Sequence, residues 1–209
     1  MIKRNYQREL DELIDRLCIE NKVPTLTLHS CCAPCSSYCL EYLSEYFRIN
    51  VVYYNPNISS REEYDLRLSE QRRLIHTMEF KHPVTLTGCD YEPSEFYEIA
   101  KGLEKCPERG ERCLACYRLR LEYAAQQAVR DGSDFFATTL TLSPLKDASA
   151  LNSIGESLSQ EYGVSYLSTD FKKKNGYKRS IELSREYNLY RQDFCGCVYS
   201  KRQTSDKTL

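Results

Sequence analysis

The sequence has no tryptophan, no long apolar run and no stretch rich in proline, glycine and serine. A helix that spans a bilayer needs about 20 consecutive apolar residues, so no membrane segment is predicted. The first ten residues, MIKRNYQREL, also lack the apolar stretch of a signal peptide. We therefore predict a cytoplasmic protein without membrane contact, and a single domain over residues 1–209 because no linker divides the chain.

A large charge of either sign is absent too. The chain carries 29 Lys and Arg against 30 Asp and Glu, which gives a formal net charge of −1. A nucleic-acid partner would therefore need a local basic patch. Cysteine is plentiful instead, with 11 among 209 residues. In a reducing compartment an odd number of thiols is a poor disulfide framework, so these cysteines indicate metal binding or redox chemistry.

Hydrophobic periodicity predicts helices that alternate with short strands. The alternation indicates an α/β fold with a mainly parallel, Rossmann-like sheet flanked by helices. Ligands of such sheets bind beyond the carboxyl ends of the strands, so we expect a cysteine-rich metal site at that edge. Strands are predicted at residues 25–28, 49–54, 84–87, 134–140 and 164–167. Helices are predicted at residues 6–22, 60–78, 92–103 and 148–162. Three further helices are predicted: one after the first strand with Ser36 or Ser37 as its cap, one that begins at Cys113, and one that ends at Tyr187.

The stretch LHSCCAPCSSYC, residues 28–39, follows the first predicted strand. Cys31 and Cys32 are adjacent, so both thiols can face one ligand only at a sharp turn such as a strand exit. Cys113 and Cys116 form a Cys-x-x-Cys pair, which presents two thiols from one helical turn. Together the pairs supply four thiolates, enough for a [4Fe–4S] cluster or for structural zinc, and both metals stay open at this point. Cys35 could bind a second metal, react as a thiol, or be stabilised as a thiolate at a helix start.

Cys195-Gly196-Cys197 is a different kind of pair. Gly196 lets the backbone close a small, strained disulfide, which would suit two-electron redox chemistry, while a further pair of metal ligands is the alternative. The remaining cysteines have no telling spacing: Cys18 and Cys39 are expected in the core of their helices, and Cys89 and Cys106 in loops.

One local concentration of positive charge follows the last predicted strand. Lysines and an arginine there, with Tyr177 among them, lie on the expected ligand edge and predict contact with the phosphates of an RNA loop. These basic residues are Lys172, Lys173, Lys174, Lys178 and Arg179.

Five ordered motifs resemble the QueH family of epoxyqueuosine reductases. They are LHSCCAPCS, YYNPNI, GERCLACYRLRLE, TTLTLSPLKD and DFKKKNGYKRSIELSREYNLYRQDFCGC, and the similarity runs from about Thr25 to Tyr199. The predicted helix within residues 1–22 lies outside it as an N-terminal extension. The resemblance implies reduction of epoxyqueuosine to queuosine at the wobble position of tRNA, with loss of the epoxide oxygen as water and with electrons from an external low-potential donor.

The resemblance also implies site residues and selects iron–sulfur over zinc. It assigns a [4Fe–4S] cluster to Cys31, Cys32, Cys113 and Cys116, and a redox-active pair to Cys195 and Cys197. The alternative is an additional iron ion beside the cluster. Cys35, Cys195 or Cys197 would bind it together with a carboxylate such as Asp147. Asp147 is also a candidate catalytic residue. Asp147, Asp170, Lys146 and Tyr54 are all possible proton donors. The chain departs from many relatives at Leu145, where a histidine is expected, and Cys89 and Cys106 match no family motif.

Two other functions compete with this interpretation. ATP-dependent sulfur transfer to tRNA on a similar fold expects a glycine-rich SGGxDS loop after the first strand, whereas this chain has SCCAPCS, without glycine. A zinc-stabilised RNA-binding module would leave Cys195 and Cys197 without a purpose.

Overall fold

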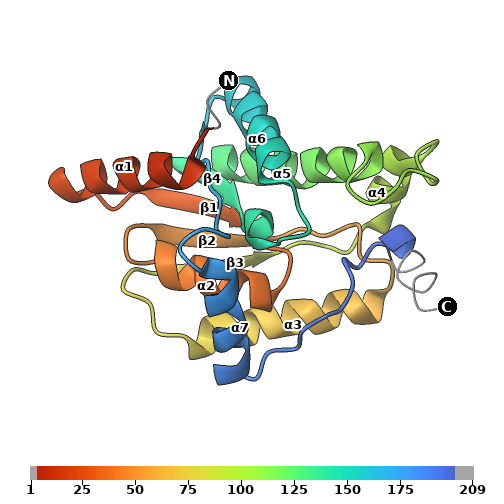
Figure 1. The fold of residues 1–209 in the computed structure, drawn as a ribbon, viewed down its shortest axis with the longest axis horizontal. Helices are drawn as coiled ribbons and strands as arrows, with labels where there is room; N and C mark the ends of the chain where they lie inside the picture. Colours follow the sequence, from red (N-terminus) through yellow and green to blue (C-terminus); the bar gives the residue numbers. More distant parts are fainter. Residues whose placement is uncertain (1–3, 201–209) are drawn as a thin grey trace.

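Five parallel strands form one sheet in the order β3-β2-β1-β4-β5 (Figure 1). They belong to a computed structural model that describes residues 4–200. The predicted parallel α/β fold is confirmed. The strands are β1 (Thr25–His29), β2 (Arg48–Tyr53), β3 (Val84–Gly88), β4 (Phe135–Thr138) and β5 (Ser165–Tyr166).

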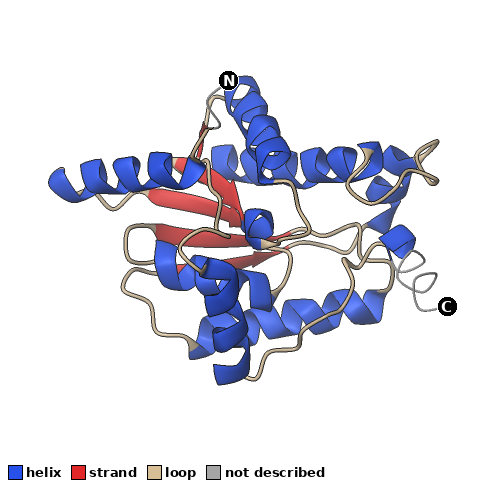
Figure 2. Cartoon of the chain, viewed as in Figure 1, coloured by secondary structure: helices blue, strands red, loops and turns tan. Residues whose placement is uncertain are grey.

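Helices cover both faces of the sheet, with α2, α3 and α7 on one side and α5 and α6 on the other (Figures 1 and 2). Each layer has its own apolar core against the strands, one that includes Leu40 and Phe47 and one that includes Leu121 and Leu151. No helix in residues 4–200 is long and apolar enough to cross a membrane. The helices are α1 (Tyr6–Ile19), α2 (Ala33–Leu43), α3 (Arg61–Thr77), α4 (Pro93–Ala100), α5 (Glu111–Asp131), α6 (Ala148–Tyr162) and α7 (Gly176–Glu186), with a short 3-10 turn, η1, at Thr139–Leu142.

The order of the strands creates a switch point between β1 and β4. The chain passes outward from β1 through β2 to β3, then returns to the other side of β1 as β4. Because the loops after β1 and β4 leave the sheet in opposite directions, they open a crevice at the carboxyl end of these strands, where such folds bind ligands. The cysteine stretch follows β1, and the loop that carries Lys146 follows η1 after β4.

Helix α2 begins earlier than predicted. Cys32 is its N-cap, with an extended backbone at φ −175°, and Pro34 occupies the first turn. Proline suits this position because its fixed φ is helical and its missing N–H would have no partner there. The predicted caps are therefore wrong: Ser36 and Ser37 lie inside the helix, where their hydroxyl groups donate to the carbonyl oxygens of Cys32 and Pro34.

The predicted core position of Cys18 is also wrong, since its side chain is exposed. The buried face of α1 is formed by Leu10, Ile14 and Leu17. Cys18 follows Leu17 directly, so the helix turns it away by about 100°. Cys39, in α2, is fully buried as predicted.

After α7, the chain runs along α3 toward the far end of the molecule (Figure 1). Gly196 adopts φ +96°, and its carbonyl oxygen accepts a hydrogen bond of 2.9 Å from the backbone N–H of Ser59. Arg67 of α3 donates to the carbonyl oxygens of Phe194 and Cys195 at 3.4 Å each. These contacts bring the C-terminal segment to the carboxyl edge of the sheet.

Candidate metal centre and active site

Three thiols gather where β1 ends. The sulfur atoms of Cys31, Cys32 and Cys35 all lie within 4.8 Å of one another, and within residues 4–200 they are the group of cysteine, histidine and acidic side chains placed to hold a metal ion. The extended backbone of Cys32 turns the chain sharply, and Cys35 returns to the same spot one helical turn later. The turn needed for adjacent cysteines to face one ligand is therefore present, and Cys35 belongs to the cluster as closely as the other two.

The cluster favours a single thiolate in the absence of metal. Hydrogen bonds from the thiols of Cys32 and Cys35, assisted by the charge of Arg120, hold the pKa of Cys31 well below its ordinary value. The same contact with Cys31 raises the pKa of Cys32 to about 12, and it also raises that of Cys35. Since the thiolate is the form that binds metals, Cys31 is the cysteine of this cluster most ready to do so.

Beneath the cluster lies a buried polar network centred on Arg120, which is 1% exposed. Its guanidinium donates to Asn55 Oδ1 at 2.5 Å and contacts His29 Nε2 at 3.3 Å. Burial and the charge of Arg120 lower the pKa of His29 well below its ordinary value, so the imidazole stays neutral. The other ring nitrogen of His29 lies 3.0 Å from Thr138 Oγ1, which joins the ends of β1 and β4.

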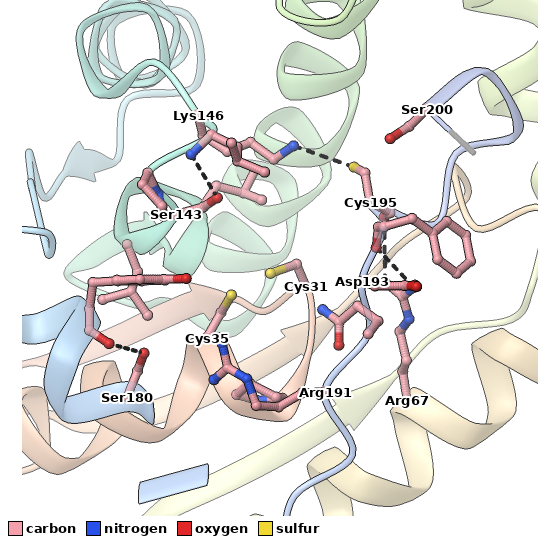
Figure 3. A pocket seen from close by; sticks show the side chains of 18 of the residues that line it. Cys31, Cys35, Arg67, Ser143, Lys146, Ser180, Arg191, Asp193, Cys195 and Ser200 are labelled. Atoms are coloured by element: carbon pink, nitrogen blue, oxygen red, sulfur yellow. Dashed lines mark hydrogen bonds between the residues drawn. The ribbon is translucent and has the colours of Figure 1, made fainter. Parts of the chain in front are cut away.

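A cavity of about 220 Å³ opens beside the cysteine cluster at the switch point (Figure 3). Its wall combines segments that lie far apart in the sequence: the cysteine stretch, the loop after η1, α5, α7 and the C-terminal segment. The chemically distinctive side chains on it are Cys31, Cys35, Cys195, Lys146, Arg67, Arg120, Arg191, Glu108 and Asp193.

Cys195 and Lys146 form a pair inside this cavity (Figure 3). The ammonium group of Lys146 donates to Cys195 Sγ at 3.3 Å and lies 5.7 Å from the centre of the Tyr117 ring. Burial opposes ionisation of Cys195, but the positive charges of Lys146 and Arg120 outweigh it and lower the pKa of the thiol. The cavity thus places a thiol of lowered pKa beside an ammonium group whose own pKa is raised, because the charge of Cys195 outweighs the effect of burial.

The predicted redox pair is divided between two environments. Both thiols are free, and Cys195 faces the cavity. Cys197 instead packs with Cys116, Phe96 and Ala100 in a small apolar cluster. There burial raises the pKa of the Cys197 thiol.

The second predicted ligand pair approaches the cysteine cluster from α5. Cys113 packs against the same apolar cluster as Cys31 and accepts a 3.3 Å hydrogen bond from the backbone N–H of Arg109. Cys116 is buried, which raises its pKa to about 11, and Arg120 opposes this rise. The two thiols lie outside the compact group of Cys31, Cys32 and Cys35. Their role as ligands remains a prediction.

Asp147 has a structural partner. Its carboxylate caps α6 by accepting hydrogen bonds from the backbone N–H groups of Ser149, at 2.8 Å, and Ala150, at 3.2 Å. The side chain is exposed and is not part of the cavity wall. Such a cap accounts for its position without a catalytic role.

The predicted RNA-binding stretch is partly neutralised within the molecule. Lys172 pairs with Asp170 at 3.0 Å, Lys174 with Asp11 at 2.6 Å and Arg179 with Glu41 at 2.5 Å. Lys173 and Lys178 are exposed and have no acidic partner within residues 4–200, so they carry the free charge of this stretch.

Sequence reasoning missed Arg120 and gave His29 no role. A signal for Arg120 was present, because it follows Cys113 by seven residues and Cys116 by four, which places all three on one face of α5. His29 had no comparable signal, since its contact with Arg120 joins residues 91 positions apart.

The family model described as epoxyqueuosine reductase QueH matches residues 26–203. A relative of that name from Staphylococcus epidermidis is 42% identical over 95% of this chain and 85% of its own length. The relatives from Streptococcus pyogenes and Staphylococcus aureus are each 40% identical over 96% of this chain, and they are covered over 79% and 85% of their lengths. The chain therefore belongs to the QueH family of epoxyqueuosine reductases.

Proposed function

We propose that this protein reduces epoxyqueuosine to queuosine at the wobble position of tRNA, in the cytoplasm. The observation that carries the proposal is the meeting of Cys31, Cys35, Cys195 and Lys146 on one cavity in a member of this family. Removal of the epoxide oxygen as water requires two electrons and two protons. The cavity offers thiolates for the former and an ammonium group for the latter.

The proposed roles of the side chains follow from their surroundings. Lys146 holds its proton beside Cys195 and delivers it to the epoxide oxygen, with the ammonium group fixed by the thiolate and the Tyr117 ring. Arg67 positions Cys195 by donating hydrogen bonds to the backbone carbonyl oxygens of Phe194 and Cys195. Oxidation of the Cys195 thiolate and the Cys197 thiol to a disulfide releases two electrons and one proton, and this proton together with the one from Lys146 balances the loss of one oxygen atom as water. An external low-potential donor then restores the thiols.

The residues present fit a thiolate-bound metal centre. Three soft sulfur donors lie within 4.8 Å of one another, the pKa of one of them is lowered, and a buried positive charge lies beside them. Cys31, Cys32, Cys113 and Cys116 would hold a [4Fe–4S] cluster, with Cys35 free for an additional iron. When bound, the cluster supplies single electrons at low potential.

The function is tested by anaerobic incubation with tRNA that carries epoxyqueuosine and a low-potential reductant, followed by mass analysis of the nucleosides. The expected product is lighter by one oxygen atom and coincides with authentic queuosine. Unchanged epoxyqueuosine with protein that carries its full complement of iron would refute the proposal. Colourless protein that holds zinc would favour the RNA-binding alternative.

A further inference from the structure

We propose that Arg120 is the built-in counter-charge of the thiolate–metal centre, and that it tunes how readily this centre accepts an electron. This inference rests on the proposed metal centre but not on the tRNA substrate.

The surroundings of Arg120 are unusual for a buried arginine. Two of its hydrogen-bond partners, Asn55 and His29, are neutral, and the third is the thiol of Cys116. A buried charge is costly unless an opposite charge or several hydrogen bonds compensate it. Within residues 4–200, no carboxylate is among the partners of Arg120 or among the groups that act most strongly on its charge.

Two other buried arginines show how this fold satisfies such a group elsewhere. Arg67 makes a 2.6 Å ion pair with Glu63 and donates to two carbonyl oxygens. Arg112 donates to three carbonyl oxygens and stacks over the Tyr199 ring at 4.5 Å. Arg120 has neither arrangement, although it is the most deeply buried of the three.

The ionisable groups that act most strongly on Arg120 are thiols, and two of them, Cys31 and Cys195, line the same cavity as Arg120. Burial works against its charge, whereas Cys116, Cys31 and Cys195 support it. These cysteines come from three separate parts of the chain: α5, the loop after β1 and the C-terminal segment. One guanidinium therefore lies among them. Arg120 also lines the cavity. Its missing partner is therefore an anion assembled from several thiolates, which is the chemistry of a cysteine-bound metal centre.

The charge has a direct consequence for electron transfer. Reduction adds a negative charge to a centre that is already anionic. A fixed positive charge in a medium of low dielectric constant stabilises the reduced form more than the oxidised one. Arg120 should therefore raise the reduction potential, and a lysine should replace it only in part because it lacks the planar fork that contacts Asn55.

The test compares wild-type protein with Arg120→Gln and Arg120→Lys, and each protein is prepared metal-free and with its metal bound. The glutamine variant can still donate to Asn55 but carries no charge. The redox equilibrium constant of the iron-loaded protein should decrease at least tenfold in Arg120→Gln. For one electron, this decrease lowers the midpoint potential by about 59 mV. Arg120→Lys should shift it less. An unchanged potential in Arg120→Gln would overturn the proposal.

Thermal stability gives a second measurement that does not depend on which metal is bound. Metal binding to the native state raises the melting temperature, and this rise should be smaller in Arg120→Gln than in the wild type. Equal losses of stability in the metal-free and loaded forms, including failure of the metal-free variant to fold, would show a purely structural arginine and overturn the proposal. Neither measurement uses tRNA. Failure of the reductase assay alone would therefore refute the substrate and leave the role of Arg120 standing.

Discussion

Lys146 Nζ lies 3.3 Å from Cys195 Sγ, and the two residues come from loops 49 positions apart. Lys146 lies in the loop that follows β4 and η1, while Cys195 lies in the C-terminal segment after α7. The contact therefore exists only in the complete fold, and it joins the proposed proton donor to the proposed redox thiol.

Replacement of Lys146 by methionine should slow alkylation of Cys195 in the metal-free protein. The pKa of this thiol is lowered from 9.0, so its thiolate persists below pH 9.0 and is lost only as the pH falls through the lowered value. Loss of the ammonium group raises the pKa again. The thiolate fraction, and with it the alkylation rate, then falls by about tenfold for each unit by which the raised pKa exceeds the pH of the experiment. Peptide mass spectrometry after timed iodoacetamide treatment gives the rate.

Lys146→Arg is the matched control, because it keeps a positive charge near Cys195. Its alkylation rate should stay close to that of the wild type. Reductase turnover should fall strongly in Lys146→Met, and equal alkylation rates in all three proteins would contradict the pairing.

Gly196→Ala should destabilise the protein and displace Cys195. The backbone at Gly196 has φ +96°, and a Cβ there would lie 3.0 Å from Ile58 Cγ1 and 3.3 Å from a terminal nitrogen of Arg67. A side chain in such a conformation costs about 1–3 kcal/mol. Chemical denaturation measures the loss. Gly102→Ala is the control, since Gly102 also has a positive φ, +78°, but its Cβ would meet no atom within 4 Å.

The two variants separate backbone strain from crowding. Gly102→Ala should lose some stability and no reductase activity, whereas Gly196→Ala should lose both. If Gly196→Ala and Gly102→Ala changed stability and reductase activity to the same extent, the position of Cys195 would not depend on the backbone conformation of Gly196.

Serine substitutions should divide the cysteines by role. Replacement of Cys31, Cys32, Cys113 or Cys116 should abolish the brown colour of anaerobically purified protein, because a hydroxyl is a poor ligand for an iron–sulfur cluster. Cys35→Ser should keep the absorption spectrum and lower the iron content. Cys18→Ser is the control, since this exposed thiol lies on α1, and its iron content should equal that of the wild type. A coloured Cys113→Ser protein with full iron would remove Cys113 from the ligand set.

Removal of the two unpaired lysines should weaken binding of tRNA. Lys173 and Lys178 are exposed and lack acidic partners among the described residues. In Lys173→Ala/Lys178→Ala, the slope of the logarithm of the binding constant against the logarithm of the salt concentration should become shallower by about 0.7 for each lost phosphate contact with a single-stranded loop. Fluorescence anisotropy at several salt concentrations measures this slope. Lys22→Ala/Lys81→Ala removes the same charge before β1 and before β3, at the opposite edge of the sheet, and should leave the slope unchanged. Equal slopes for both double variants would exclude the proposed RNA contact.

The fold was accessible to sequence analysis because its signals are local. The predicted helix at residues 148–162 matches α6 in both of its ends, since Asp147 and Gly163 supply standard capping residues. The fourth strand was predicted too long, to residue 140. Thr138 ends it by accepting a hydrogen bond from the backbone N–H of Leu140, which starts η1.

The site was only partly accessible. Spacing located Cys31 and Cys32 at a strand exit, but it could not decide how Cys35, Cys195 and Cys197 divide among cluster, cavity and core. That division depends on contacts between distant segments, such as Arg67 with the carbonyl oxygen of Cys195. Arg120 shares a helix face with Cys116, yet its proposed role follows only from its burial without an acidic partner in the described part of the chain.

The C-terminal segment has a consequence for the order in which the site is assembled. Cys31, Cys32 and Cys35 are translated well before Cys195 and the segment bound to Arg67. Until that segment has been translated and has packed against α3, the cavity lacks the part of its wall that carries Cys195. A metal ion delivered earlier would meet an incomplete site, so we expect the proposed metal centre to be completed only after Cys195 has been translated.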